Sequence, residues 1–156
     1  MGESTKDAAG TSLPPPLTYL IGLLLGIPLG LVIPVQFLPG GLGPVVGLPI
    51  AIVGLYVLSS AARAFSRNKT SVVPTEPTTK IVQEGPYSFS RNPIYLSFSL
   101  IYLGIALAFS SFWAVVFLVP IMVFIDRGQI VREEKYLEKK FGDEYVQYKS
   151  RVRRWI

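Results

Sequence analysis

The sequence contains neither cysteine nor histidine. The lack of cysteine excludes disulfides and thiolate metal sites, and the lack of histidine removes the usual imidazole base and most zinc chemistry. Any catalysis must therefore use carboxylates, arginine, lysine, tyrosine or the positioning of substrates. No metal site is expected.

Charge is missing from two long stretches, residues 17–62 and 92–125. Half of the 156 residues are hydrophobic and the mean hydropathy is +0.45, which is too apolar for an ordinary soluble domain of this length. The net charge of +5 comes from Lys and Arg that fall, with one exception, in residues 63–91 and 127–154. Such a distribution is typical of the cytoplasmic side of a polytopic membrane protein that also contacts lipid headgroups, so nucleic-acid binding is not expected.

Turn residues divide the apolar stretches into four segments. A Gly- and Pro-rich turn separates the first two segments, and Ser110-Ser111 divides an apolar block that is too long for one crossing. Each segment is near the length that a helix needs to cross the hydrocarbon core, although the last two are short. The sequence predicts transmembrane helices over about residues 17–35, 45–62, 94–109 and 112–126, with a polar loop over 64–84.

The two ends of the chain differ from this apolar body. Residues 1–16 are polar and proline-rich, which predicts a flexible lead ahead of a single domain over 17–156. Residues 127–156 repeat apolar side chains at helical spacing, and Gly142-Asp143 predicts a corner between two short helices. The expected fold is all-α, with four transmembrane helices plus a C-terminal amphipathic helical arm. Both termini are expected on the cytoplasmic side of the membrane. In a bacterium this membrane would be the plasma membrane.

A polar stretch, Gly85 to Tyr95, leads into the third predicted helix. Arg91 and Asn92 precede Pro93, which suits the first turn of a helix, where free N–H groups and the helix dipole favour an anion such as a carboxylate. The aromatic side chains in the same stretch attract organic cations. S-Adenosylmethionine, with a carboxylate, an ammonium group, a sulfonium and hydroxyls, suits this mixture.

Glu133 and Glu134 lie side by side in the predicted arm, and successive helical residues diverge by about 100°, so only one of them can face a given site. The same residues also fit a purely structural interpretation. Arg91 and the basic tail would then reach toward headgroups, the tyrosines would form an interfacial belt, and the glutamates would be solvated. Composition alone leaves both interpretations open.

Two motifs follow one another at a distance of about forty residues. They read Gly85-Pro86-Tyr87-x-x-x-Arg91-Asn92-Pro93-x-Tyr95 and Glu133-Glu134-x-x-Leu137-x-x-x-Phe141-Gly142-x-x-Tyr145-x-x-Tyr148. Together they resemble the integral membrane methyltransferases of the isoprenylcysteine carboxyl methyltransferase and phospholipid methyltransferase group, over about residues 78–153. The resemblance implies S-adenosylmethionine-dependent transfer of a methyl group to a carboxylate or amine of a lipophilic acceptor, either isoprenoid or phospholipid-like, in contact with membrane lipids.

The resemblance also implies the residues of the site. Arg91, Asn92 and Glu133 would be catalytic, and Glu134 would support helix packing. The cofactor pocket would comprise Thr79, Lys80, Ile81, Val82, Tyr87, Asn92, Pro93, Ile94, Tyr95 and Glu133. The acceptor would contact Gln129, Arg127 and Arg132, because some members carry an arginine at the position of Gln129.

The identity of the acceptor stays open at this stage. Members with protein substrates carry histidine where this chain has Asn92, whereas asparagine is found among lipid-modifying and bacterial members. Two alternatives lie outside methyl transfer. One is a non-catalytic membrane scaffold or lipid-binding protein that keeps the fold, and the other is an NADPH-dependent membrane reductase.

Overall fold

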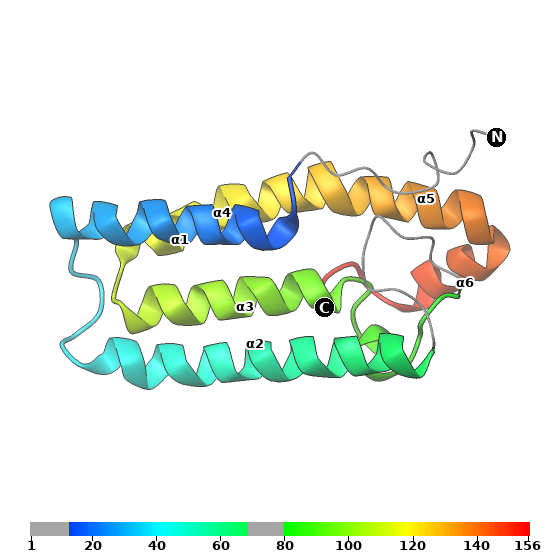
Figure 1. The fold of residues 1–156 in the computed structure, drawn as a ribbon, viewed down its shortest axis with the longest axis horizontal. Helices are drawn as coiled ribbons and strands as arrows, with labels where there is room; N and C mark the ends of the chain where they lie inside the picture. The colour runs from blue at the N-terminus through cyan, green and yellow to red at the C-terminus, as the bar shows by residue number, and fades with distance from the viewer. Residues whose placement is uncertain (1–12, 69–79) are drawn as a thin grey trace.

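A computed structural model describes residues 13–68 and 80–156, and within these ranges the chain forms helices and no strand. Four long helices lie side by side along the long axis of the molecule (Figure 1). They are α1 Pro15–Val32, α2 Leu42–Arg67, α3 Pro93–Ala108 and α4 Phe112–Phe124. The all-helical architecture that the sequence predicts is therefore confirmed for the described residues.

Helices α5 and α6 lie at one end of the molecule, and the connections from α1 to α2 and from α3 to α4 lie at the other (Figure 1). The short 3₁₀ helix η1 Gly85–Ser88 precedes α3, and the π-helical segment η2 Ile125–Ile130 joins α4 to α5 Val131–Phe141. Helix α6, Asp143–Arg151, follows after Gly142, whose φ of +54° lies in the region that favours glycine. The predicted corner between two short helices is confirmed.

Three helices are long and apolar enough to cross a membrane: α1, α2 and the continuous helix Phe112–Phe141. Helix α3 is apolar but shorter, with 16 residues. The outer faces of α1 and α2 leave large apolar side chains exposed, among them Leu24, Leu31, Val45 and Tyr56. Such faces suit contact with lipid, because their side chains are apolar and most backbone polar groups in the body of a helix are bonded within it. These features describe a membrane protein.

Helix α3 contacts α1, α2 and α4, and small residues allow the helices to approach closely. A Cβ atom added at Gly47 of α2 would lie 2.3 Å from the carbonyl oxygen of Gly104 in α3. A Cβ atom added at Gly26 of α1 would lie 2.5 Å from Cα of Ala114 in α4. These close approaches leave no room for larger side chains at either interface.

Hydrogen bonds from hydroxyl groups also join the helices of the bundle. The hydroxyl groups of Tyr19 and Ser99 lie 2.9 Å apart and link α1 to α3. The Ser111 hydroxyl donates to the carbonyl of Gly26 at 3.0 Å, and the Tyr102 hydroxyl donates to that of Ala114 at 2.8 Å. Polar groups in an apolar bundle thus find partners on neighbouring elements.

The helix boundaries differ from the predicted ones at several points. Helix α1 covers 15–32 and not 17–35, because a proline tolerates the first helical turn, where its missing N–H would have no partner. Helix α2 covers 42–67 and not 45–62, because its last turns pack Ala61 and Ala64 into a cluster with Val82 and Tyr87. The first residues of the predicted loop 64–84 are consequently helical. Residues 1–12 of the predicted lead and 69–79 of the loop lie outside the described residues.

The fourth predicted span, 112–126, and the start of the predicted arm belong to one helix. The helix continues without interruption from Phe112 to Phe141. At the end of η2 the N–H of Val131 donates to the carbonyl of Asp126, five residues earlier. The helix is therefore wider here than an α-helix, but it continues into α5. The appearance of charged residues at Asp126 changes the surroundings of the helix but does not interrupt its hydrogen bonds.

Candidate functional site

The candidate site lies where the start of α3 meets η2 and α5, at the end of the bundle that also holds α6 and the C-terminus (Figure 1). Pro93 occupies the first turn of α3, as the sequence predicts, and buried Asn92 precedes it. The Asn92 side chain does not cap the helix. Its Nδ2 donates to the carbonyl of Arg154 at 3.0 Å, and the backbone N–H of Arg91 donates to the carbonyl of Arg153 at 2.9 Å. The C-terminal segment therefore lies against the start of α3.

Glu134 is held by two arginines in a buried position, with 7% of its side chain exposed. Arg154 contacts both carboxylate oxygens, Nε to Oε1 at 3.1 Å and Nη2 to Oε2 at 2.7 Å. Nη1 of Arg91 lies 3.0 Å from Oε1, an ion pair without the alignment of a hydrogen bond. Paired charges of this kind are stable when buried only if their geometry is good, and the two-pronged contact of Arg154 provides it.

Glu133 faces different partners, as expected for the next residue along a helix. The hydroxyl of Tyr95 in α3 donates to Oε1 of Glu133, and it lies 3.5 Å from Oε1 of Gln129. Nε2 of Gln129 donates to the carbonyl of Leu13 at 2.8 Å. Three elements and the chain ahead of α1 thus meet at one buried polar cluster.

Burial raises the pKa of the Glu133 carboxyl to about 7. The hydrogen bond from Tyr95 opposes this change, and the nearby Glu134 carboxylate adds to it. Glu133 belongs to α5, which carries charge at seven of eleven positions and lies beyond the apolar part of the long helix. A carboxyl with this pKa changes between its acid and base forms near neutral pH.

Tyrosines hold η1 and the residues before it against α6. The Tyr148 hydroxyl donates to the carbonyl of Tyr87 at 2.8 Å, and the Tyr87 ring meets that of Phe65 edge-on at 5.2 Å. Ile81 packs with Tyr145 and Tyr148. Burial raises the pKa of Tyr87 and Tyr148, so both hydroxyls stay protonated at neutral pH.

Most of the predicted site residues lie at this junction. The structure brings together the following residues around the start of α3: Ile81, Val82, Tyr87, Arg91, Asn92, Pro93, Ile94, Tyr95, Gln129 and Glu133. It does not bring Arg127 and Arg132 to Gln129, because both arginine residues are exposed while Gln129 is buried. Lys80 is exposed as well, and Thr79 lies outside the described residues. In the described part of the chain no group of acidic residues gathers to hold a metal ion.

Reasoning from the sequence missed the residues that surround these side chains. Arg154 also reaches Asp126, Nη1 to Oδ2 at 3.1 Å, and Nε1 of Trp155 donates to Oδ1 of Asp126 at 2.9 Å. The carbonyl of Leu13 is a further partner that no side-chain pattern reveals. The only sequence signal for the C-terminal contacts is Arg153-Arg154-Trp155. The same residues are equally typical of a basic C-terminus exposed to solvent.

Comparison with known proteins identifies the family. The phospholipid methyltransferase family model matches residues 42–144, which run from α2 into the start of α6. The chain belongs to the phospholipid methyltransferase family. The resemblance seen in the two motifs is thereby confirmed, and methyl transfer is the chemistry of the group to which the chain belongs.

Several proteins are similar to part of the chain. An uncharacterized protein of Haemophilus influenzae is 46% identical over 63 residues, which are 40% of this chain and all of the relative. Protein-S-isoprenylcysteine O-methyltransferase of Saccharomyces cerevisiae is 31% identical over 112 residues, covering 69% of this chain and 46% of the relative. Protein-S-isoprenylcysteine O-methyltransferase B of Arabidopsis thaliana is 31% identical over 109 residues, covering 68% and 55%. The chain spans about half the length of these two methyltransferases, and no solved structure matches it.

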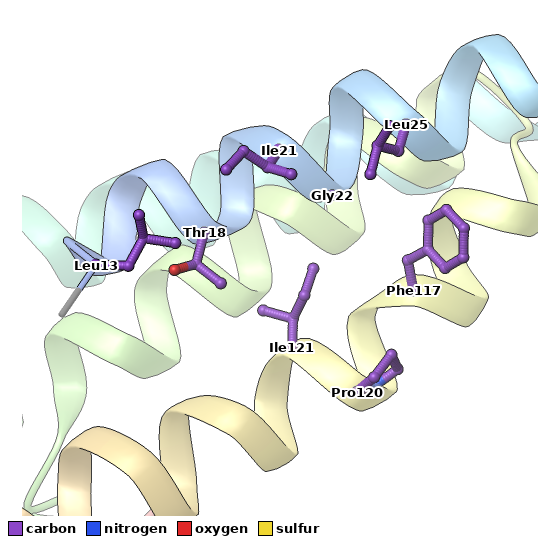
Figure 2. A pocket seen from close by; sticks show the side chains of 8 residues that line it. All are labelled: Leu13, Thr18, Ile21, Gly22, Leu25, Phe117, Pro120 and Ile121. Atoms are coloured by element: carbon purple, nitrogen blue, oxygen red, sulfur yellow. The ribbon is translucent and has the colours of Figure 1, made fainter.

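An apolar hollow lies between α1 and α4 of this methyltransferase-family protein, with a volume of about 220 Å³. Figure 2 shows Thr18 on α1 and Phe117 and Ile121 on α4 at either side of it. Leu13 lines the same hollow, and its carbonyl accepts the hydrogen bond from Gln129. The hollow therefore adjoins the polar cluster around Glu133 and has the apolar character that suits a hydrocarbon chain.

Proposed function

We propose that the protein is an integral membrane methyltransferase that uses S-adenosylmethionine and methylates a carboxylate or amine of a lipophilic acceptor. One observation carries this proposal: the two motifs of the family, far apart in sequence, contact each other through Tyr95 with Glu133 and Arg91 with Glu134. A scaffold that had only kept the fold would not need the buried Glu133 carboxyl, whose pKa of about 7 reflects the cost of burying its charge.

Four membrane-spanning helices suit this function, with α3 as the third. Helix α3 is short for a crossing, but α1, α2 and α4 surround it, so it needs little lipid contact of its own. The candidate site and the charged arm then lie together at the cytoplasmic surface. Reporter fusions at residues 40 and 110 should report the outer side and a fusion at residue 156 the cytoplasm, and any reversal would contradict this topology.

The junction fits the proposed cofactor. Nη1 of Arg91 is ion-paired with Glu134, but the buried Nε of Arg91 has no hydrogen-bond partner among the described residues and is a donor for a carboxylate. The Glu133 carboxylate is an acceptor for hydroxyl or ammonium groups, and the rings of Tyr87 and Tyr95 attract a sulfonium. When bound, S-adenosylmethionine supplies a methyl group activated by the positive sulfur.

The chain's own residues would contribute alignment, exclusion of water and one proton acceptor. A carboxylate acceptor is already ionised at neutral pH, so its methylation needs no base and depends on orientation, which contributes several kcal/mol in well-aligned cases. An amine acceptor must lose a proton, and a Glu133 carboxyl with a pKa of about 7 suits that task. The two acceptor classes thus make different demands on Glu133.

The relatives and the hollow support a lipophilic acceptor. The yeast and plant relatives are named for methylation of isoprenylcysteine, and the hollow beside Gln129 offers apolar surface to an isoprenoid or acyl chain. Transfer of a labelled methyl group to extracted lipids, followed by mass spectrometry of the product, would identify the acceptor. Release of the label as methanol by base would indicate a methyl ester, and retention of the label on the nitrogen-containing fragment would indicate a methylated amine.

Binding of S-adenosylhomocysteine to the purified protein, measured by calorimetry, tests the proposal. The unaltered protein should give saturable heat, and Glu133→Ala should weaken binding while the helices stay folded. Glu138→Ala is the matched control, because Glu138 lies in the same helix with an exposed side chain paired to Lys149. No saturable heat for the unaltered protein would favour a non-catalytic scaffold, and saturable binding of NADPH in its place would favour a reductase.

A further inference from the structure

The last residues of the chain, Val152–Ile156, form a segment that turns away from α6 and lies outside the region matched by the family model. Its backbone begins extended, with φ −117° and ψ 130° at Val152. The carbonyls of Arg153 and Arg154 accept hydrogen bonds from the backbone N–H of Arg91 and from Nδ2 of Asn92. The segment is therefore attached to the two residues that begin the candidate site.

Side chains of the same segment attach it to the long helix. Arg154 contacts Glu134 through two nitrogens and Asp126 through the third, and Trp155 donates to the other oxygen of Asp126. Asp126 and Glu134 are eight residues apart and stand on one face of the helix that includes η2 and α5. One short segment thus contacts the start of α3 and also contacts the long helix at Asp126, before Gln129, and at Glu134, after Glu133.

We propose that Val152–Ile156 is a clamp and that Arg154 is its positioning residue, which keeps Arg91 and Asn92 in place relative to Glu133 for the methyl transfer proposed above. Arg154 acts through Glu134. The Glu134 carboxylate is the only ion-pair partner of Arg91 among the described residues, and Arg154 fixes the plane of that carboxylate by its two-pronged contact.

Charge neutralisation alone would not require this arrangement. Arg91 by itself balances the charge of Glu134, and the second arginine brings its own counter-charge in Asp126. What Arg154 adds is geometry, because its planar fork contacts two carboxylates at once and a lysine ammonium cannot reproduce that contact. An Arg-to-Lys substitution therefore keeps the charge and removes the positioning.

The experiment compares Arg154→Lys with Arg153→Lys in the full-length protein in detergent. Arg153 is the matched control, since its side chain is exposed and makes no hydrogen bond or ion pair within the described residues. Three quantities are measured: the dissociation constant for S-adenosylhomocysteine, the melting temperature, and hydrogen exchange in the peptide that contains the Arg91 amide. Arg154→Lys should weaken binding by the folded protein on the order of tenfold and speed exchange at Arg91. The melting temperature should fall as well, because the two-pronged contact with the buried Glu134 is lost. Arg153→Lys should leave all three unchanged.

A conservative second variant guards against loss of folding. Trp155→Phe keeps an aromatic ring but removes the N–H bond to Asp126 and part of the indole's packing against the core. It should move exchange and binding in the same direction as Arg154→Lys, by a smaller amount. The clamp is overturned if Arg154→Lys leaves binding and exchange unchanged, or if its effects match those of Arg153→Lys. It is also overturned if melting temperature falls while binding by the folded protein is unaltered. Failure of the unaltered protein to bind S-adenosylhomocysteine would instead refute the proposed function, and the exchange measurement would still test the clamp.

Discussion

The bundle of α1 to α4 and the polar end around α5 and α6 are stabilised by different interactions. In the bundle, glycines such as Gly26 and Gly47 bring helix backbones into contact, and the outer faces are apolar. At the polar end, buried carboxylates meet arginines and tyrosines. Helix spacing in this protein therefore depends on small side chains, whereas the geometry of the site depends on a few long polar ones.

The largest effect on stability is expected at the polar end, from Glu134→Gln. The neutral amide leaves two arginines without their shared counter-charge, and Arg91 is buried with 10% of its side chain exposed. Breaking a buried ion pair in this way costs about 3–5 kcal/mol. Unfolding of the protein by denaturant would measure the loss. An effect no larger than that of the exposed control Glu138→Gln would show that the polar end contributes little to stability.

A smaller loss is expected in the bundle, from Gly47→Ala. The added methyl group would meet the Gly104 carbonyl at 2.3 Å, so α2 and α3 must separate, at a cost of about 1–3 kcal/mol. Gly40→Ala is the control, because a Cβ atom there meets nothing within 4 Å. Thermal unfolding measures both variants. Affinity for S-adenosylhomocysteine should stay unchanged in the folded fraction of Gly47→Ala. A loss of affinity in that fraction would show that the packing of α2 on α3 also sets the geometry of the site.

Glu133→Gln should change pH dependence more than stability. The pKa of Glu133 in the folded protein, about 7, lies above its ordinary value of 4.5, so the folded state favours the protonated form. Ionisation therefore destabilises the fold as pH rises through 7, and Glu133→Gln should raise the melting temperature at pH 8 but not at pH 4.

The same ionisation should govern ligand binding. If the carboxylate is the binding form, affinity for S-adenosylhomocysteine should increase about tenfold between pH 6 and pH 8. Calorimetry at several pH values measures this change, and Glu133→Gln should abolish it. An unaltered pH profile in the variant would remove Glu133 from the binding site.

The smallest effect is expected for Lys149→Met. Lys149 pairs with Glu138 at 3.2 Å on the surface of the polar end, with 41% and 45% of the two side chains exposed. Exposed ion pairs contribute about 0–1 kcal/mol, because water screens the charges. Denaturant unfolding should hardly differ from that of the unaltered protein. A loss approaching that of Glu134→Gln would mean that burial does not distinguish the two ion pairs.

Much of the fold was predictable because it depends on local properties. Uncharged stretches identified the apolar helices, Pro93 identified the start of α3, and Gly142 identified the corner between α5 and α6. The differences from the predicted boundaries lie where local signals are ambiguous: α1 begins at Pro15, and α2 continues to Arg67. In the site, the family resemblance predicted that the two motifs meet. It did not predict the contacts of Arg154, Trp155 and the Leu13 carbonyl around them.

Hydropathy and backbone preference act between near neighbours, so the apolar helices, their turns and the polar residues at their ends follow from local sequence. The contacts of Arg154 with Glu134 and Asp126, and of the Leu13 carbonyl with Gln129, arise from the packing of distant segments. These partners are separated by 20 to 116 residues, so nothing in their local sequence selects them. Helix packing brings them together, and the low polarity of the interior then favours their pairing.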